Sequence, residues 1–149
     1  MADTYTNILF HIIFSTKHRR PLITPEIKPR LYEYMGGIIR NHGGVLYEIG
    51  GVADHLHLLV RWNTEAIKDL TRQMKSDSTK WIKQTFAGQL DFCWQSGGGI
   101  FSVSQSQAGR VTRYIQGQEN HHHKQSFMDE YVCFLKKNGI AYDERYLFD

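Results

Sequence analysis

Two histidines and a tyrosine-glutamine pair are the residues of this chain whose types and spacing suit metal-assisted chemistry. His55 and His57 alternate with leucines in residues 54–60, and this alternation predicts a β-strand with both imidazoles on one face. Residues i and i+2 of a strand lie roughly 6.6 Å apart, so one cation between them can accept a nitrogen from each at roughly 2.1 Å. Tyr114 and Gln118 are four residues apart and therefore share one face of a predicted helix. The histidine pair alone is weak evidence, and the second segment is what makes a metal site the preferred interpretation.

Such a group suits the cleavage of a phosphodiester. A divalent cation held by His55, His57 and Gln118 would bind a non-bridging phosphate oxygen and hold the phosphate in line with the oxygen of Tyr114. Tyr114 is then the predicted nucleophile. Because a free phenol has a pKa near ~10, forming the phenolate at pH 7 costs on the order of 4 kcal/mol unless a metal, cation or base assists. The product, a phosphotyrosine, would allow rejoining without a nucleotide cofactor. The ligand set does not distinguish Mg²⁺ from Mn²⁺.

Each of these residues also has a structural interpretation. His55 and His57 can be strand histidines satisfied by hydrogen bonds. Tyr114 can be a core tyrosine of an amphipathic helix, as most helical tyrosines are, and the chain has seven other tyrosines. The run His121-His122-His123 can bind a metal, but it lies at a predicted helix end, where histidines more often cap carbonyls or face solvent. We favour packing and capping for this run, and we expect His11 to be a buried structural residue beside the site.

The composition indicates one globular domain over residues 1–149. At 149 residues, of which 41% are hydrophobic and 13% aromatic, the chain is long enough for one core and too short for two ordinary domains. A net charge of +3 permits a polyanionic partner without requiring one. Cys93 and Cys133 have no Cys-x-x-Cys spacing, which favours reduced thiols in a cytoplasm. No segment has the pattern of a secretion signal or the ~18 apolar residues of a membrane span, so we expect no membrane contact.

The element order predicts an α+β fold of the ferredoxin-like split βαβ type. Aromatic and β-branched runs indicate strands at residues 5–15, 45–49, 55–62 and 100–103. Capping residues and apolar periodicity indicate helices at residues 24–41, 63–86, 107–119 and 127–138. We expect Gly50 and Gly51, with residues 53–54, to form a tight connection, and Gly97-Gly98-Gly99 to belong to a mobile connection. The central sheet is antiparallel, helices cover one face, and the C-terminal helices carry Tyr114.

Two groups of basic residues are candidate DNA contacts. One follows the polar face of the predicted helix at residues 63–86, where the apolar stripe is Ile67, Leu70, Met74 and Trp81 and the basic row is Lys68, Arg72, Lys75 and Lys83. Such a row is usually a solvated face, but it can also follow a phosphate backbone. The other group contains Lys17, His18, Arg19 and Arg20, which form either a solvated turn or a contact to hairpin DNA.

Taken together, the motifs resemble those of a known family, the single-tyrosine HUH transposases of small bacterial insertion sequences and their domesticated relatives associated with repeated extragenic palindromes. The His-hydrophobic-His motif is His55-Leu56-His57, and the tyrosine helix matches residues 111–118, followed by His121-His122. Residues 10–19 and 139–147 are also similar to the family. The resemblance covers nearly the whole chain, and the combination of motifs in this order is highly specific.

The resemblance implies a DNA transposase that cuts and rejoins single-stranded DNA at element ends marked by imperfect hairpins, through a 5′-phosphotyrosine intermediate. It implies Mg²⁺ or Mn²⁺ held by His55, His57 and Gln118, with Tyr114 as nucleophile. It also implies an obligate homodimer, in which the tyrosine helix of one subunit can complete the metal site of the other. Gly97-Gly98-Gly99 and Gly109 could supply the hinge for that exchange. Gly117 lies between nucleophile and ligand and costs a helix interior about 1 kcal/mol relative to alanine.

Three other functions fit parts of the pattern. A replication-initiator or relaxase nickase shares the chemistry, but such enzymes usually carry larger domains or two tyrosines. A noncatalytic module would hold hairpin DNA or RNA on its sheet and basic helix without cutting it. A small metal-dependent hydrolase would release its products to water and form no covalent adduct with the protein.

Overall fold

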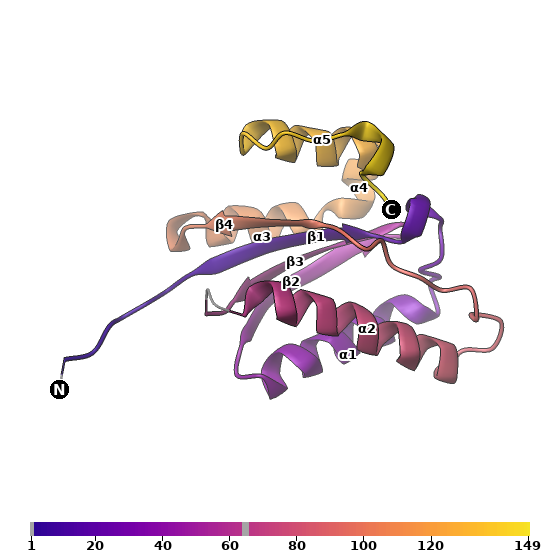
Figure 1. Cartoon of the computed structure of the whole chain (residues 1–149), viewed down its shortest axis with the longest axis horizontal. Coiled ribbons are helices and arrows are strands. Elements are labelled where there is room, and N and C mark those ends of the chain that lie inside the picture. Colours follow the sequence, from indigo (N-terminus) through magenta and orange to yellow (C-terminus); the bar gives the residue numbers. More distant parts are fainter. Residues whose placement is uncertain (1, 64–65) are drawn as a thin grey trace.

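A four-stranded antiparallel sheet forms the centre of the molecule (Figure 1). The computed structural model describes residues 2–63 and 66–149. The strands are β1 (Leu9–Ser15), β2 (Val45–Val52), β3 (His55–Arg61) and β4 (Gly99–Val103), in the spatial order β2-β3-β1-β4. Helix α1 (Ile27–Asn41) connects β1 to β2, and α2 (Ile67–Thr85) connects β3 to β4. Each helix therefore joins two parallel strands with a third strand between them, which confirms the split βαβ prediction.

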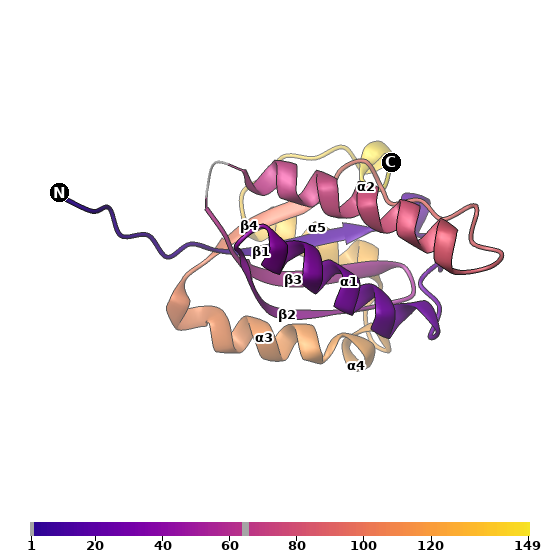
Figure 2. The same cartoon turned by 90° about the horizontal axis from the view of Figure 1, so that it is seen from below.

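Helices lie on both faces of the sheet. Figures 1 and 2 show α1 and α2 side by side on one face, while the C-terminal helices lie on the other. The C-terminal helices are α3 (Ala108–Gln116), α4 (Gln118–His122) and α5 (Phe127–Lys137). Three short 3-10 helices, Lys17–Arg19, Gln105–Gln107 and Glu144–Tyr146, complete the described structure. None of the helices in the described residues is both long enough and apolar enough to cross a membrane.

Strict alternation along β1 and β3 divides the hydrophobic core into separate clusters. Phe10, Ile12 and Phe14 of β1 point toward α1 and α2, where they pack with Leu56, Leu58 and Val60 of β3. The opposite face carries two smaller clusters. One joins Leu9 and Leu59 to Ala108 and Ile115 of α3, and the other joins Ile13 and Phe101 to Phe127, Tyr131 and Leu135 of α5. Because side chains of a strand alternate in direction, His55 and His57 fall on this second face, between the two smaller clusters.

The strand bounds differ from the prediction where glycine permits a close approach. We expected Gly50 and Gly51 in a connection, but both lie within β2, opposite His57 and Leu56 of β3. A Cβ atom on Gly50 would lie 2.6 Å from the carbonyl oxygen of Ile115, so only glycine lets α3 pack this closely on β2. The connection between β2 and β3 is the turn at residues 53–54. Strand β1 begins at Leu9, because residues 5–7 leave the sheet and are exposed.

Two helix predictions also need correction. The predicted helix at residues 107–119 is two helices, since the backbone leaves the helical region at Gly117 (φ −88°, ψ 13°). The predicted start at residues 63–65 falls partly on Thr64 and Glu65, which lie outside the described residues, and α2 begins at Ile67. In its buried stripe, Ile82 is fully buried while Trp81 is only half-buried.

The connection before β4, which we expected to be mobile, is held by hydrogen bonds. The ammonium group of Lys75 donates to the carbonyl oxygens of Gln95 (3.2 Å), Ser96 (3.3 Å) and Gly97. The backbone N–H of Ser96 donates to the backbone oxygen of Asp149 at 2.6 Å. Through these contacts, residues 95–97 are bound to α2 on one side and to the C-terminal residue on the other.

Candidate metal centre and active site

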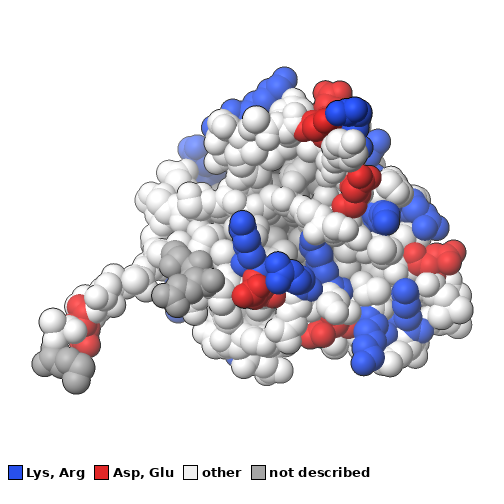
Figure 3. Space-filling model, in the orientation of Figure 1, with Lys and Arg blue, Asp and Glu red and all other residues white. Residues whose placement is uncertain are grey.

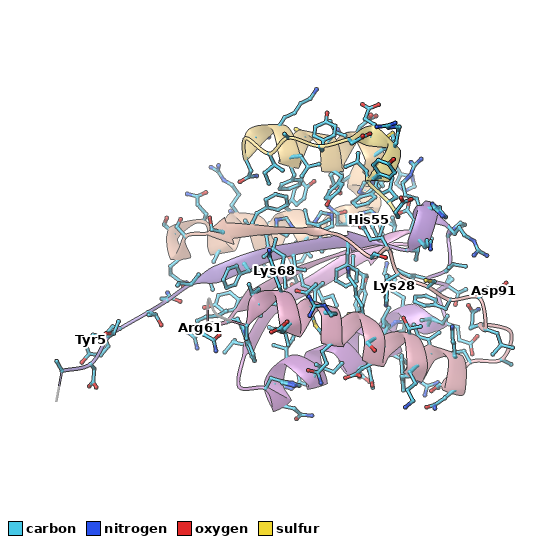
Figure 4. All side chains as sticks on the ribbon, in the orientation of Figure 1. Tyr5, Lys28, His55, Arg61, Lys68 and Asp91 are labelled. Atoms are coloured by element: carbon cyan, nitrogen blue, oxygen red, sulfur yellow. The ribbon has the colours of Figure 1, made fainter. Side chains whose placement is uncertain are left out.

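Histidines from two elements converge between the sheet and the C-terminal helices. His55 and His57 are fully buried on β3, and Figure 4 places His55 on the side of the sheet that faces α4 and α5. His122, at the end of α4, brings a third imidazole, whose ring centroid lies 4.5 Å from that of His55. With Glu130 of α5, these histidines offer four ligand atoms that all lie within 4.8 Å of one another.

Each of the three histidines is oriented by an outer partner on its Nδ1 atom. Nδ1 of His55 lies 2.7 Å from Oδ1 of Asp54, and Nδ1 of His57 lies 2.7 Å from Nε2 of His11. Nδ1 of His122 lies 2.7 Å from the carbonyl oxygen of Gln125. In metal sites, such partners fix the tautomer and leave the other ring nitrogen free to ligate. The Nε2 atoms of these histidines all point at the same carboxylate.

That carboxylate belongs to Glu130, which is 2% exposed. Its Oε1 atom lies 2.8 Å from Nε2 of His57, 3.4 Å from Nε2 of His55 and 3.3 Å from Nε2 of His122. Its Oε2 atom accepts hydrogen bonds from the hydroxyl of Tyr114 and, at 3.1 Å, from Nε2 of Gln118. The two oxygens therefore face different sets of partners.

Tyr114 and Gln118 reach the cluster from different helices. Tyr114 lies near the end of α3, and Gln118 begins α4 after the break at Gly117. The Oε1 atom of Gln118 lies 2.9 Å from Nε2 of both His55 and His122. The ring of Tyr114 lies 5.7 Å from that of His57, centroid to centroid. The structure thus brings all four residues of the predicted site together. Tyr114 and Gln118, however, lie on two successive helices rather than on one continuous helix.

Burial and hydrogen bonding shift the pKa values within the cluster in opposite directions. Burial lowers the pKa of His57 to about 4, against the opposing effect of Glu130. Burial also opposes the charged form of His55, but its hydrogen bonds to Asp54, Glu130 and Gln118 raise its pKa overall. Burial alone would raise the pKa of Glu130, but the surrounding imidazoles hold it well below its usual range. Glu130 is therefore a carboxylate anion in this site.

The nucleophile candidate is held in its neutral form. Burial, and then the hydrogen bond to the Glu130 carboxylate, raise the pKa of Tyr114 above that of a free phenol. His121 lies near the same hydroxyl, with its Nε2 atom 3.4 Å from Oη of Tyr114 and 3.1 Å from Oε2 of Glu130. The free energy needed to form the phenolate in this environment exceeds the value of about 4 kcal/mol for a free phenol at pH 7. A cation or a proton acceptor must therefore offset a larger cost.

The donor set fits a divalent cation. Imidazole nitrogens from His55, His57 and His122, a carboxylate oxygen from Glu130 and an amide oxygen from Gln118 converge on one buried place. Mixed nitrogen and oxygen donors of this kind suit first-row transition metals such as Mn²⁺ better than they suit Mg²⁺, which prefers oxygen ligands and retains water. A metal centre is therefore chemically compatible with the residues present.

Our sequence interpretation missed Glu130 and assigned His122 only to packing and capping. His122 does contact a backbone carbonyl, as expected, but its Nε2 atom belongs to the cluster. The signal for Glu130 lies in the periodicity of α5. Phe127, Tyr131 and Leu135 recur every four residues on the buried face, and an acid three residues after Phe127 falls on that apolar stripe. His11 is buried beside the site, as predicted, and burial followed by the nearby His57 lowers its pKa to about 3.

The candidate DNA contacts lie in two regions. Arg19 borders an open groove of about 610 Å³ that also contains Asp54, His122 and Phe127, while Lys17 and Arg20 are exposed nearby in the chain. On the other face of the sheet, Lys and Arg side chains gather over α2 around a hollow (Figure 3).

The hollow over α2 is a cavity of about 650 Å³ between this helix and residues 93–100. Lys68, Arg72 and Lys75 are its basic lining residues. Lys68 and Arg72 are exposed, and Arg72 pairs with Asp69 at 3.0 Å. Lys75 donates to backbone carbonyls instead, and Lys83 is exposed outside the cavity. Figure 4 labels Lys68 and His55 on opposite sides of the sheet, so the two regions are separate.

Comparison with protein families shows to which family the chain belongs. The sequence pattern of the family described as "Transposase IS200 like" matches residues 4–118, a span that contains His55, His57, Tyr114 and Gln118. The chain belongs to the IS200-like transposase family. The match ends at Gln118, so the third histidine and the buried glutamate of this transposase, His122 and Glu130, lie outside the matched span.

Two solved structures have the same fold as this transposase. A candidate transposase from Deinococcus radiodurans R1 superposes with a TM-score of 0.63 at 20% identity, covering 79% of this chain and 95% of the other. The REP-associated tyrosine transposase bound to a REP hairpin superposes with a TM-score of 0.61 at 15% identity, covering 82% of this chain and 73% of the other. At these identities the likeness concerns the fold. Comparison with curated proteins gave no match.

Proposed function

We propose that this transposase cuts and rejoins single-stranded DNA at hairpin-marked ends through a covalent 5′-phosphotyrosine on Tyr114. The observation that carries the proposal is the joint position of the nucleophile and the metal-type cluster. The hydroxyl of Tyr114 donates to one oxygen of Glu130, while the other oxygen of the same carboxylate faces Nε2 of His55 and His57. A phosphate that reaches these imidazoles is therefore within reach of the phenol oxygen.

We assign His55, His57 and Gln118 to hold a divalent cation, Mn²⁺ or Mg²⁺. When bound, this cation supplies Lewis-acid stabilisation of the charge that develops on the phosphate. The chain's own residues do the rest. The oxygen of Tyr114 attacks phosphorus, the bond from phosphorus to the 3′ oxygen breaks, and the departing 3′ oxygen takes a proton from water. The phenol proton leaves toward the side on which Glu130 already accepts its hydrogen bond. Rejoining is the reverse attack by a 3′-hydroxyl.

The substrate part of the proposal rests on the fold and on the charge distribution. A transposase of similar fold is bound to a hairpin, and this chain presents exposed basic side chains in two regions. We propose that Lys17, Arg19 and Arg20 contact the strand near the cleavage point, and that Lys68, Arg72 and Lys83 contact hairpin phosphates. Lys75 was predicted to join them, but its ammonium donors are directed at backbone carbonyls, so we assign it a structural role.

A salt titration of hairpin binding tests these contacts. Replacing Lys68 or Arg72 with alanine is expected to reduce the slope of log K against log salt by about one for each phosphate that the variant no longer neutralises. The Asp69→Ala change is the matched control on the same helix turn. It is expected to leave the slope unchanged or to steepen it, because it releases Arg72. If the Lys68 and Arg72 variants have the same slope as the wild type, α2 does not contact the DNA phosphates.

We further propose a homodimer, as the resemblance to the family implies. The described chain places Tyr114 beside its own histidines, so a mixed dimer tests whether that arrangement also operates in cleavage. A Tyr114→Phe subunit is mixed with a His55→Ala, His57→Ala subunit. If the mixture cleaves DNA and neither variant does so by itself, the subunits share their active sites. If a proven mixed dimer does not cleave, each site works within one chain. Light scattering that gives only a monomer would contradict the dimer.

The cleavage experiment uses single-stranded DNA copied from the flanks of the gene. The protein is incubated with this DNA in Mn²⁺ or in EDTA and resolved on a denaturing gel. We expect a covalent adduct in Mn²⁺ that is absent in EDTA and in the Tyr114→Phe protein. An adduct of equal yield with Tyr114→Phe would contradict the proposal.

One observation favours a noncatalytic hairpin-binding module as the second candidate. The pKa of Tyr114 is raised by burial and by its hydrogen bond to Glu130, which opposes formation of the nucleophile. Tight binding of the hairpins with no adduct and no cleavage in Mn²⁺ would support this function. The two candidates therefore give opposite results on the same gel.

A further inference from the structure

We infer that Glu130 of α5 is an additional, anionic ligand of the metal and that the same carboxylate positions the Tyr114 hydroxyl beside it. The inference rests on the proposed metal-dependent function. It assigns a role to a residue outside the span that matches the family.

The Oε1 atom of Glu130 is the common neighbour of the ligating nitrogens. It lies between 2.8 and 3.4 Å from Nε2 of His57, His122 and His55. An outer partner occupies the Nδ1 atom of each of these rings. A cation bound by the three Nε2 atoms would therefore lie next to Oε1 of Glu130, which is already in position to bind it.

The Oε2 atom of Glu130 faces the reacting side. It accepts from the Tyr114 hydroxyl and from Nε2 of Gln118, and it lies 3.1 Å from Nε2 of His121. Gln118 contributes its amide N–H on this side, while its Oε1 atom faces His55 and His122. The carboxylate thus bridges the ligand cluster and the phenol.

The burial of Glu130 also favours a cation. An ionised carboxylate that is 2% exposed must be paired, because its desolvation is costly. Among the described residues, every cationic partner of Glu130 within 4.0 Å is a histidine, and no lysine or arginine contacts it. The ring N–H of an imidazole can donate a hydrogen bond to this carboxylate, whereas a divalent cation would also balance its negative charge.

The ligand set that results is three imidazoles, one carboxylate and one amide oxygen. Compared with two imidazoles and an amide alone, it adds one negative charge and one nitrogen. We therefore expect selection of Mn²⁺ over Mg²⁺. The position of Tyr114 then depends on the same residue that holds the metal.

Calorimetric titration of Mn²⁺ into the metal-free full chain tests the inference without using activity. We expect Glu130→Gln to weaken Mn²⁺ binding by tenfold or more, since even outer-shell partners of metal ligands are worth about 10- to 100-fold. Asp129→Asn on the same turn of α5 is the matched control. It removes an acidic side chain outside the cluster and should leave the affinity unchanged.

The outcomes separate this inference from the proposed function. If the wild-type chain binds no Mn²⁺, the metal-dependent function itself fails. If the wild type binds and Glu130→Gln binds equally well or more tightly, Glu130 is not a ligand and the inference is overturned. Circular dichroism in EDTA checks that Glu130→Gln is folded. If it is not, Glu130→Asp decides, because it keeps the charge but draws the carboxylate back by one methylene, and unchanged Mn²⁺ affinity would again overturn the inference.

Discussion

Replacing Gly50 with alanine should loosen the active site through the backbone rather than through any ligand. A Cβ atom at this position would lie 2.6 Å from the carbonyl oxygen and 3.0 Å from Cγ2 of Ile115, whereas ordinary contacts begin at 3.4 Å. Helix α3 must then retreat from β2 by about 0.8 Å, the difference between 2.6 and 3.4 Å. Overpacking of this kind costs roughly 1–3 kcal/mol of unfolding free energy.

The chemical consequence follows because Ile115 is the neighbour of Tyr114. A displacement approaching 1 Å at a reacting group lowers rates by up to about 100-fold. Urea denaturation and adduct formation in Mn²⁺ are the two assays for Gly50→Ala. Gly37→Ala is the control, since its Cβ would meet nothing within 4 Å and should stabilise α1 by about 0.5–1 kcal/mol. If Gly50→Ala is as stable and as active as the wild type, α3 does not depend on close packing against β2.

Three other changes test the supports of the site. Asp54→Asn removes the carboxylate that orients His55 and should weaken Mn²⁺ binding by about 10- to 100-fold in a calorimetric titration. Unchanged affinity would show that Asp54 does not support metal binding. Ser126→Ala removes the side-chain cap of α5, whose Oγ accepts from the N–H of Asp129, and urea denaturation should show a loss of about 1 kcal/mol. Burial lowers the pKa of Lys75 to about 8 from 10.5, so between these pH values the unfolded chain binds more protons and the unfolding free energy gains a contribution that rises with pH. That contribution should disappear in Lys75→Met and persist in Lys83→Met, and identical pH profiles for the two variants would contradict it.

The sequence predicted the sheet well because its signals are local. Alternation in residues 55–60 reports directly which side chains share a face, and the β3 pairing confirms it. Helix α1 begins at Ile27, three residues after the predicted start, but the Thr24 side chain acts as the prediction supposed, because its hydroxyl oxygen accepts from the N–H of Ile27 at 3.3 Å. These patterns need only neighbours along the chain.

The parts that the sequence did not predict depend on contacts between distant segments. Gly50 and Gly51 have the composition of a turn, and only the approach of α3 explains why they lie in β2. The break at Gly117 separates Tyr114 from Gln118, so their common position comes from tertiary packing rather than from helical spacing. Glu130 joins the cluster because α5 folds back over β3, which no spacing within the site motifs encodes.

The most direct test of the central claim is to locate the covalent attachment of DNA within the protein. The Mn²⁺-dependent adduct is digested with protease and nuclease, and the modified peptide is sequenced by tandem mass spectrometry. We predict a phosphodiester on the oxygen of Tyr114 alone among the eight tyrosines. Attachment at another residue, or cleaved DNA whose ends are free of protein, would contradict this claim.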